Sequence, residues 1–295
     1  MRSFSYHKPK SVRDTVALLN RYGEEAVLLS GGTDLLVELK KRVRNPSHIV
    51  SIQGIPGLRR VEPDGEDLLH VGPGVTIQTL TNHPALTGGL RLLSQAASLL
   101  GSWQIRNRAT LGGNICHASP SGDTLPALLC LKAVLKLESL DGERVVPAEN
   151  FFLGPGQTAA LPGEMLTDIL IPRPPAGSCG VYKKFGARQK MDLAVASVAV
   201  LGVVDPPAKC FSSIRIGLGA VAPTPIRSRK AEDLLSGSKV SEELIADAAR
   251  SAAMEASPIS DLRASEGYRR EIIRHLTQEA LREIWVQGRT NPGQT

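Results

Sequence analysis

The 295-residue sequence is poor in aromatic residues and has no long apolar run. Phe, Trp and Tyr together make up 4% of the chain, too few for a stacking platform that binds single-stranded nucleic acid. The net charge of +6 is spread along the chain, and we expect no nucleic-acid binding. No stretch approaches the roughly 18 apolar residues of a membrane span. The N-terminus also lacks an apolar signal core, so we predict a cytoplasmic protein.

Cysteine is scarce, and its spacing is uninformative. The four residues Cys116, Cys130, Cys179 and Cys210 include no pair separated by two to four positions. Local pairs of this kind build zinc and iron–sulfur sites, so we predict no metal site in this chain. Each cysteine is interpreted as a small buried apolar residue, although the role of Cys116 stays open.

Three common catalytic motifs are missing. No G-x-G-x-x-G follows the first predicted strand, which argues against a nicotinamide-type Rossmann domain. The sequence contains no G-x-x-x-x-G-K-[ST] and no G-x-S-x-G. These absences exclude a P-loop nucleotide hydrolase and leave a serine hydrolase unsupported.

Two glycine-glycine loops are the most informative feature that is present. They are Ser30-Gly31-Gly32-Thr33-Asp34 and Thr110-Leu111-Gly112-Gly113-Asn114. Paired glycines allow backbone N–H groups to approach a bulky anion without obstruction by a Cβ atom. A helix that begins after such a loop adds a favourable dipole. Two loops of this kind predict a clamp on a pyrophosphate, and a dinucleotide such as FAD is the first candidate ligand.

The pattern of apolar residues divides the chain into three predicted segments. The first, residues 1–55, contains a strand, a helix and a strand in the order of a βαβ unit. The second, residues 56–177, includes a hairpin around Asp141-Gly142 and ends at a Pro-rich linker. The third, residues 178–295, has three β-rich runs followed by three helical stretches.

Three polar residues each allow two interpretations. Asp123 precedes a helical run and is either a helix N-cap or a carboxylate that accepts hydrogen bonds from ligand hydroxyls. Lys184 is either a solvated strand residue or a cation near a flavin, where it would stabilise the charge that develops on reduction. His117 follows the second glycine loop, and we favour a structural or solvent-facing position over a catalytic role.

Taken together, these motifs resemble the FAD-binding medium subunits of the molybdenum hydroxylase family. The resemblance rests on residues 28–35, 104–114 and 118–127, and it continues at residues 162–166 and 221–227. It therefore covers nearly the whole chain. The family includes the medium subunit of carbon monoxide dehydrogenase and the flavin domain of xanthine dehydrogenase.

The resemblance implies an α+β fold. Two α/β subdomains would form a PCMH-type FAD-binding domain, followed by a three-stranded antiparallel sheet with a three-helix bundle. It also implies an oxidoreductase subunit in a dimer of heterotrimers. A large molybdopterin subunit and a small subunit with [2Fe–2S] clusters would supply electrons through FAD to NAD⁺, a quinone or another acceptor. No catalytic residue is required of this chain.

The resemblance also implies the residues that contact FAD. Asp123 would hold ribityl or ribose hydroxyls, Leu166 would lie beside the isoalloxazine, and Lys184 would lie near its pyrimidine edge. Asp192 and Leu193 would lie beside the flavin ring, where carbon monoxide dehydrogenases are expected to carry a tyrosine at the second position. The other implied contacts are Leu28, Leu29, Ser30, Gly31, Gly32, Thr33, Asp34, Leu35, Leu100, Thr110, Leu111, Gly112, Gly113 and Asn114.

Two alternative functions remain open at the level of sequence. One is a self-sufficient flavin oxidase of the vanillyl-alcohol oxidase type, covalent or non-covalent, which also clamps FAD between two lobes. The other is a non-enzymatic FAD-binding scaffold. The substrate of the complete enzyme is not readable from this chain, because its pocket would lie in another subunit.

Overall fold

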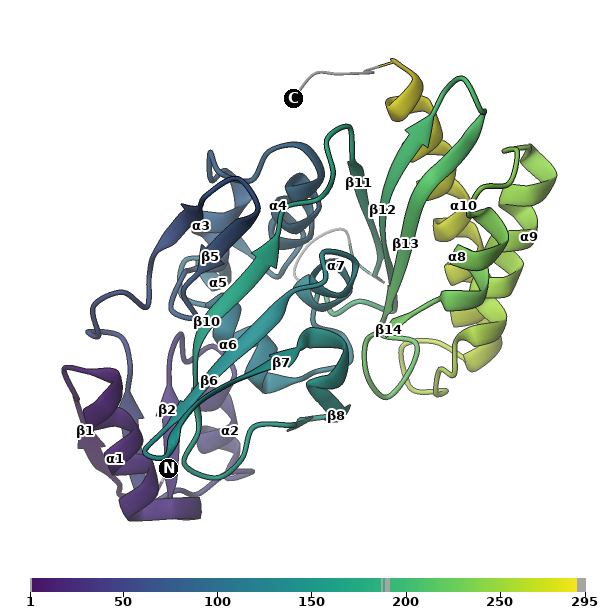
Figure 1. The fold of residues 1–295 in the computed structure, drawn as a ribbon. Helices are drawn as coiled ribbons and strands as arrows, with labels where there is room; N and C mark the ends of the chain where they lie inside the picture. The colour runs from purple at the N-terminus through teal and green to yellow at the C-terminus, as the bar shows by residue number, and fades with distance from the viewer. Residues whose placement is uncertain (1, 187, 189–191, 291–295) are drawn as a thin grey trace.

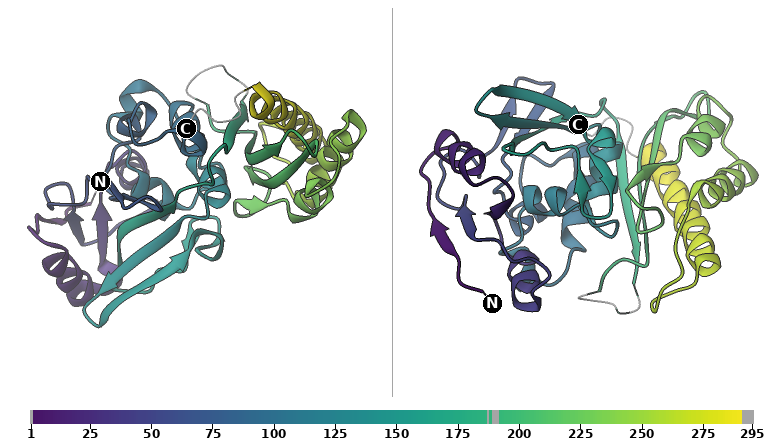
Figure 2. Two further views of the ribbon diagram at one scale, coloured as in Figure 1. Left: turned by 45° about the horizontal axis from the view of Figure 1, so that its top comes forward. Right: turned by 90° about the horizontal axis from the view of Figure 1, so that it is seen from below.

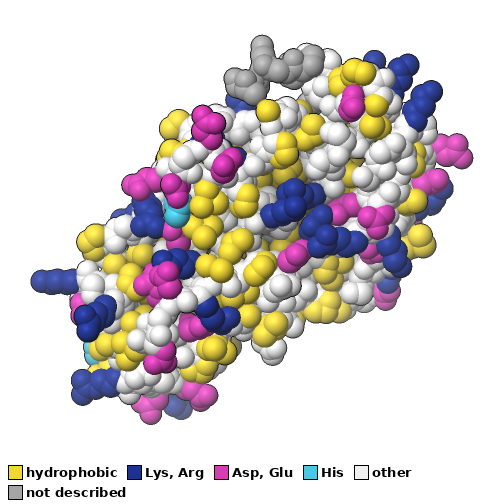
Figure 3. Space-filling model, viewed as in Figure 1, with side chains coloured by type: hydrophobic (Ala, Val, Ile, Leu, Met, Phe, Trp, Pro, Cys, Tyr) yellow, Lys and Arg dark blue, Asp and Glu magenta, His cyan; other side chains and the backbone are white. Residues whose placement is uncertain are grey.

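A computed structural model of the protein describes residues 2–186, 188 and 192–290. The elements form three groups that follow one another along the chain, and the second group lies between the other two (Figure 1, Figure 2). Lys, Arg, Asp and Glu are interspersed over the face in Figure 3, as a modest net charge predicts.

The first group is a small parallel sheet with strand order β1-β3-β2. As predicted, β2 and β3 pair in parallel and α2 connects them, with Leu28 opposite Val50. Ser11 caps α1 by accepting a hydrogen bond of 3.0 Å from the N–H of Asp14. The elements are β1 (Ser5–His7), α1 (Val12–Tyr22), the 3₁₀ turn η1 (Gly23–Glu25), β2 (Ala26–Leu29), α2 (Leu35–Lys41) and β3 (His48–Ser51).

The second group is built on a five-stranded sheet with order β4-β5-β10-β6-β7. Its strands are β4 (Val61–Asp64), β5 (Leu68–Val71), β6 (Val134–Ser139), β7 (Gly142–Pro147) and β10 (Met165–Pro172). All neighbours pair antiparallel, so the prediction of a second α/β subdomain is corrected to α+β. The connections explain this antiparallel order. The predicted tight hairpin joins β6 and β7, whereas parallel neighbours would need a helical crossover of the βαβ kind.

Helices, turns and a small hairpin complete the second group. The elements are α3 (Ile77–Thr81), η2 (Gly88–Leu90), α4 (Arg91–Ser98), α5 (Trp103–Arg106), α6 (Leu111–His117), α7 (Thr124–Cys130), η3 (Ala148–Asn150), β8 (Phe152–Gly154) and β9 (Gln157–Thr158).

The third group has four antiparallel strands in the order β11-β12-β13-β14 and three helices. The sequence predicted three strands. The fourth strand is only two residues long and follows a segment with Pro223 and Pro225, so the sequence has no alternating pattern that would predict it. The elements are β11 (Cys179–Phe185), β12 (Ala196–Asp205), β13 (Cys210–Gly219), β14 (Ile226–Arg227), α8 (Arg229–Leu235), α9 (Glu242–Glu255) and α10 (Glu266–Thr290).

The third sheet packs directly on the second group. The largest apolar core joins α4 and α7 to Tyr182 and Leu201 of the third sheet. A Cβ atom on Gly217 would lie 2.5 Å from the carbonyl oxygen of Pro126, so only glycine permits this approach of β13 to α7. This contact brings β11 beside the start of α7, where Asp123 lies.

The described part of the chain has neither a membrane-spanning helix nor a cluster of metal ligands. No helix within it is long and apolar enough to cross a membrane. The same residues contain no group of three or more His, Cys, Asp or Glu side chains placed to hold a metal ion.

A cavity between two glycine loops

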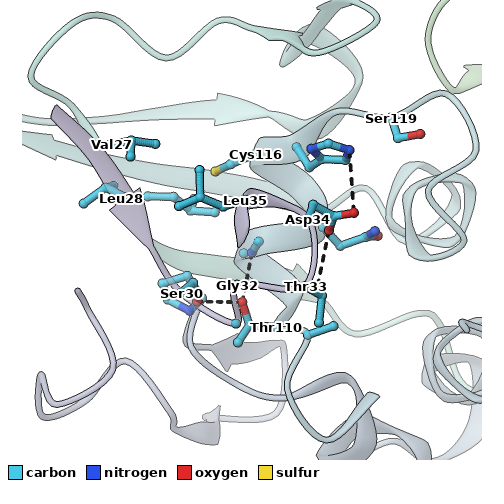
Figure 4. Close-up of a pocket in the computed structure, with 18 of the residues that line it drawn as sticks. Val27, Leu28, Ser30, Gly32, Thr33, Asp34, Leu35, Thr110, Cys116 and Ser119 are labelled. Carbon is cyan, nitrogen blue, oxygen red and sulfur yellow. Dashed lines mark hydrogen bonds and ion pairs between the residues drawn. The ribbon is translucent and has the colours of Figure 1, made fainter. Parts of the chain in front are cut away.

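A cavity of about 710 Å³ lies where the first and second groups meet. Its wall comes from β2 and the loop after it, from α6, from the start of β10, and from Asp192 and Leu193 of the third group. Figure 4 shows Leu28 and Ser30 at the left of the view and Ser119 at the upper right, with Leu35 and Cys116 between them. Both predicted glycine loops therefore face the same space.

The first loop presents a row of free backbone donors. Residues 30–35 all line the cavity, and no oxygen of the described residues accepts a hydrogen bond from their six N–H groups. The first N–H of α2 with a backbone acceptor is that of Leu36, which donates to the Gly32 carbonyl at 3.2 Å. Residues 30–33 and 35 are half-buried and Asp34 is exposed. Free N–H groups in a loop and at the start of the following helix, all in the wall of one cavity, are typical of a site for an anion.

The two glycines of this loop are required for different reasons. A Cβ atom on Gly31 would lie 2.2 Å from the Arg108 carbonyl oxygen, so glycine allows the loop to pack on the chain before the second motif. Gly32 has φ +79°, a left-handed conformation that favours glycine. Neither feature is visible in the sequence alone.

The second loop differs from the sequence prediction, in which its backbone N–H groups wrap the pyrophosphate. The N–H of Leu111 donates to Val75 and that of Gly112 to Pro73, each at 2.9 Å. The side chain of Thr110 accepts from the N–H of Gly113 at 3.0 Å. The N–H groups of residues 111–114 are thus already engaged, and this loop forms a wall at the start of α6.

Asp123 is held by two residues of β11. It is buried, Tyr182 donates to its Oδ1 at 3.0 Å, and Nζ of Lys184 donates to its Oδ2 at 2.8 Å. Burial raises the pKa of Asp123, while the Lys184 charge and both hydrogen bonds act to lower it. Burial and the nearby Asp123 charge raise the pKa of Tyr182 well above its usual value. Asp123 lines the cavity, and its side chain does not cap α7.

Most of the residues predicted to contact a ligand line this cavity. They are Leu28, Ser30, Gly31, Gly32, Thr33, Asp34, Leu35, Leu100, Thr110, Gly112, Gly113, Asn114, Asp123, Leu166, Asp192 and Leu193. Their contact with FAD stays a prediction.

Three predicted residues do not line the cavity. Leu111 is fully buried in the main core. Leu29 lies beneath the first loop, where a Cβ on Gly32 would come within 3.0 Å of its Cδ1. Lys184 donates to the Leu99 carbonyl at 3.1 Å and to Asp123. It therefore contacts a cavity residue without lining the cavity itself.

Sequence reasoning left out several cavity residues. Cys116 and His117 follow the second loop by two and three positions, belong to α6 and line the cavity. Cys116 is exposed and lines the cavity, and desolvation by the surrounding protein raises the pKa of its thiol to about 12. Glu38 and Arg44 also line the space. Helical spacing from Asp34 would have identified Glu38, whereas no local signal identifies Arg44.

The chain matches two family descriptions in succession. Residues 2–174 match "FAD binding domain in molybdopterin dehydrogenase", and residues 181–284 match "CO dehydrogenase flavoprotein C-terminal domain". It is 35% identical to a carbon monoxide dehydrogenase medium chain of Hydrogenophaga pseudoflava, over 96% of this chain and 98% of the relative. It is 34% identical to the nicotine 6-hydroxylase medium subunit of Paenarthrobacter nicotinovorans, over 94% and 96%.

Solved structures are similar over the same extent. A carbon monoxide dehydrogenase chain from Hydrogenophaga pseudoflava superposes with a TM-score of 0.93, covering 97% of this chain and 98% of that one. Quinoline 2-oxidoreductase from Pseudomonas putida 86 superposes with a TM-score of 0.91 at 26% identity, covering 97% and 98%.

Proposed function

The chain belongs to the family of FAD-binding subunits of molybdopterin dehydrogenases, and on this premise we propose that it transfers electrons between a [2Fe–2S] partner subunit and an acceptor. It is an oxidoreductase subunit, and FAD is its cofactor. The proposed acceptor is NAD⁺, a quinone or another oxidant. The proposed partners are a large molybdopterin subunit and a small iron–sulfur subunit, assembled in the cytoplasm as a dimer of heterotrimers.

The residues of the cavity fit FAD. The six unpaired N–H groups of residues 30–35 suit the diphosphate, which carries negative charge and accepts many hydrogen bonds. Gly113 has only the Thr110 hydroxyl within 4 Å of the position of a Cβ atom, so the wall there is open to a ligand. This row of donors beside an open cavity is the observation that carries the proposal.

The protein residues have binding and orienting roles. Residues 30–35 would hold the diphosphate, and Asp123 would accept hydrogen bonds from ribityl or ribose hydroxyls. Leu166 is the second residue of β10, just before a bulge between Leu166 and Asp168, and would pack beside the isoalloxazine. Lys184 would orient Asp123 and favour its ionised form against the effect of burial. When bound, FAD supplies the two-electron redox chemistry, and no general base is required of the chain.

Exposed apolar residues, one of them in the cavity wall, support a macromolecular partner. Leu99, Trp103 and Leu193 are 45%, 52% and 61% exposed, and Leu193 itself lines the cavity. Exposed apolar side chains that gather near a functional site are typical of interaction surfaces. This arrangement favours a subunit of a complex over an enzyme that works alone.

The test is an absorbance spectrum of the purified chain, with chromatography of the cofactor released by heat. We expect about one FAD per chain and no iron–sulfur absorbance. A colourless protein that takes up no added FAD would contradict the proposal. A flavin that stays attached after denaturation would instead favour the vanillyl-alcohol oxidase type, and FAD binding without any electron exchange with partner subunits would favour the scaffold.

A further inference from the structure

His117 lines the cavity and lies between the carboxylates of Asp34 and Glu38. Its Nε2 is 3.9 Å from Oδ1 of Asp34, and its Nδ1 is 3.8 Å from Oε1 of Glu38. His117 belongs to α6, whereas Asp34 precedes α2 and Glu38 lies within it. The ring therefore spans the space between the helices that follow the two glycine loops.

Each ring nitrogen of His117 faces one carboxylate. The protonation state of the ring therefore decides how many of the two carboxylates it can serve as a donor. A neutral imidazole has one N–H donor, so it can serve only one of the two carboxylates. An imidazolium has two N–H donors, one for each carboxylate, and its positive charge attracts both carboxylates. Both distances exceed a direct hydrogen bond, so the interaction is an ion pair or is bridged by water.

The local charge depends on this one side chain. Glu38 already pairs with Arg44, whose Nε lies 3.1 Å from Oε2. For Asp34, the described residues offer only the Thr33 hydroxyl at 3.3 Å besides His117 (Figure 4). With a neutral His117 the four side chains carry one net negative charge, and with a protonated His117 they carry none.

That negative charge lies where the cofactor's diphosphate is expected. Asp34 is itself one of the six residues whose N–H groups are unpaired. A carboxylate without a countercharge beside these donors repels the anion that they attract. The site therefore binds the diphosphate more tightly when a neighbouring cation neutralises the carboxylate.

We propose that His117 is a further FAD-binding residue, which in its protonated form neutralises Asp34 and Glu38 and so admits the diphosphate. This inference rests on the proposed function. Since binding favours the protonated ring, FAD affinity falls as the pH rises and the ring loses its proton. By linkage, binding of FAD takes up protons within the pH range where the affinity changes, and none below it, where the ring is already protonated.

The other ionisable groups of the cavity have different partners. Asp123 pairs with Lys184, and Glu164 pairs with Arg144 at 2.6 Å. Asp192 accepts the N–H of Arg188 at 2.8 Å. The remaining groups are Glu24, which is exposed, and Cys116, whose pKa of about 12 keeps it protonated between pH 6 and 8.5.

The experiment titrates the full, FAD-depleted chain with FAD between pH 6 and 8.5 and follows flavin fluorescence. The variants are His117→Gln, which is always neutral, and His117→Lys, which stays charged. His275→Gln is the control, because His275 is exposed on α10 and pairs only with Glu279 of its own helix among the described residues. Asp123 and the other groups are unchanged in every variant, so their titration is common to all.

For the wild type we expect Kd to rise about tenfold across this range, as one charge near a diphosphate at intermediate dielectric predicts. His117→Gln should bind at the weak level throughout, His117→Lys at the tight level throughout, and His275→Gln should follow the wild type. An unchanged pH dependence in His117→Gln, or a wild-type Kd that does not vary, would overturn the inference while leaving FAD binding intact. If no protein bound FAD at any pH, the proposed function itself would fail.

Discussion

The hydroxyl oxygens of Ser30 and Thr110 lie 2.7 Å apart, although 80 positions separate the two residues. The same Thr110 oxygen accepts the N–H of Gly113, and the Gln53 amide donates to the Ser30 carbonyl at 2.6 Å. This small network ties the free N–H groups of the first loop to the start of α6. The spacing between the two loops is therefore set by side-chain hydrogen bonds.

Replacement of Thr110 by valine should loosen this connection. Valine keeps the shape of threonine but removes the acceptor that caps α6, which costs about 1 kcal/mol of stability, and it removes the link to Ser30. FAD titration should show weaker binding together with the modest fall in Tm. Ser11→Ala, which removes an equivalent cap from α1, should lower Tm to a similar degree and leave FAD affinity unchanged; equal affinity losses in both variants would argue against a specific connection.

Replacement of Gly113 by leucine should block the cavity. The position of a Cβ there has no neighbour closer than the Thr110 hydroxyl at 3.0 Å, and a longer side chain projects into the space for FAD. We expect FAD occupancy to be lost, while far-UV circular dichroism stays that of the wild type. Gly267→Leu provides the comparison, because nothing lies within 4 Å of its Cβ position; full occupancy in Gly113→Leu would refute the location of the cofactor.

Removal of the Lys184 charge should make stability depend on pH. Burial already raises the pKa of Asp123 and Lys184 opposes this shift, so Lys184→Met raises the pKa further. An aspartate whose pKa is higher in the folded state holds a proton that the unfolded chain has released. Its folded form therefore loses stability as the pH rises above the unfolded value.

Urea unfolding from pH 4 to pH 8 measures this effect. The deficit of Lys184→Met relative to wild type should be small at the acid end and grow to about 3 kcal/mol near pH 8, the cost of a buried charge without its partner. Lys183→Met is the neighbouring control, since Lys183 forms a partly exposed pair with Glu283. A deficit that is constant with pH would mean that lost packing, and not Asp123, is responsible.

FAD should protect Cys116 from alkylation. The thiol faces the cavity and its pKa of about 12 makes it a slow nucleophile at pH 8, because the thiolate is the reactive form. Mass spectrometry after iodoacetamide treatment should show slow labelling without FAD and none with it. Cys179, a half-buried free cysteine outside the cavity, should label equally in both samples; equal labelling of Cys116 with and without FAD would place the cofactor elsewhere.

Local patterns predicted much of the fold. The apolar run at residues 26–29, the glycine loop and the following amphipathic stretch gave the βαβ unit, and Asp141-Gly142 gave the β6–β7 hairpin. The three predicted helical stretches of the last segment are α8, α9 and α10. The antiparallel order of the central sheet and the two-residue strand β14 were missed, since both depend on pairing between distant segments. The proposed domain boundaries after residues 55 and 177 stay predictions.

The sequence by itself pointed to many, but not all, of the residues that line the cavity. Two glycine motifs and Asp123 identify the ligand class, because residue type and spacing decide whether a backbone can approach an anion. Only the tertiary structure decided how each group is used. Val75 and Pro73 occupy N–H groups of the second loop, Lys184 turns to Asp123, and His117 meets Asp34 and Glu38. Hydrogen bonds and charges act over a few ångströms between residues far apart in the chain, so their partners are known only once the chain has folded.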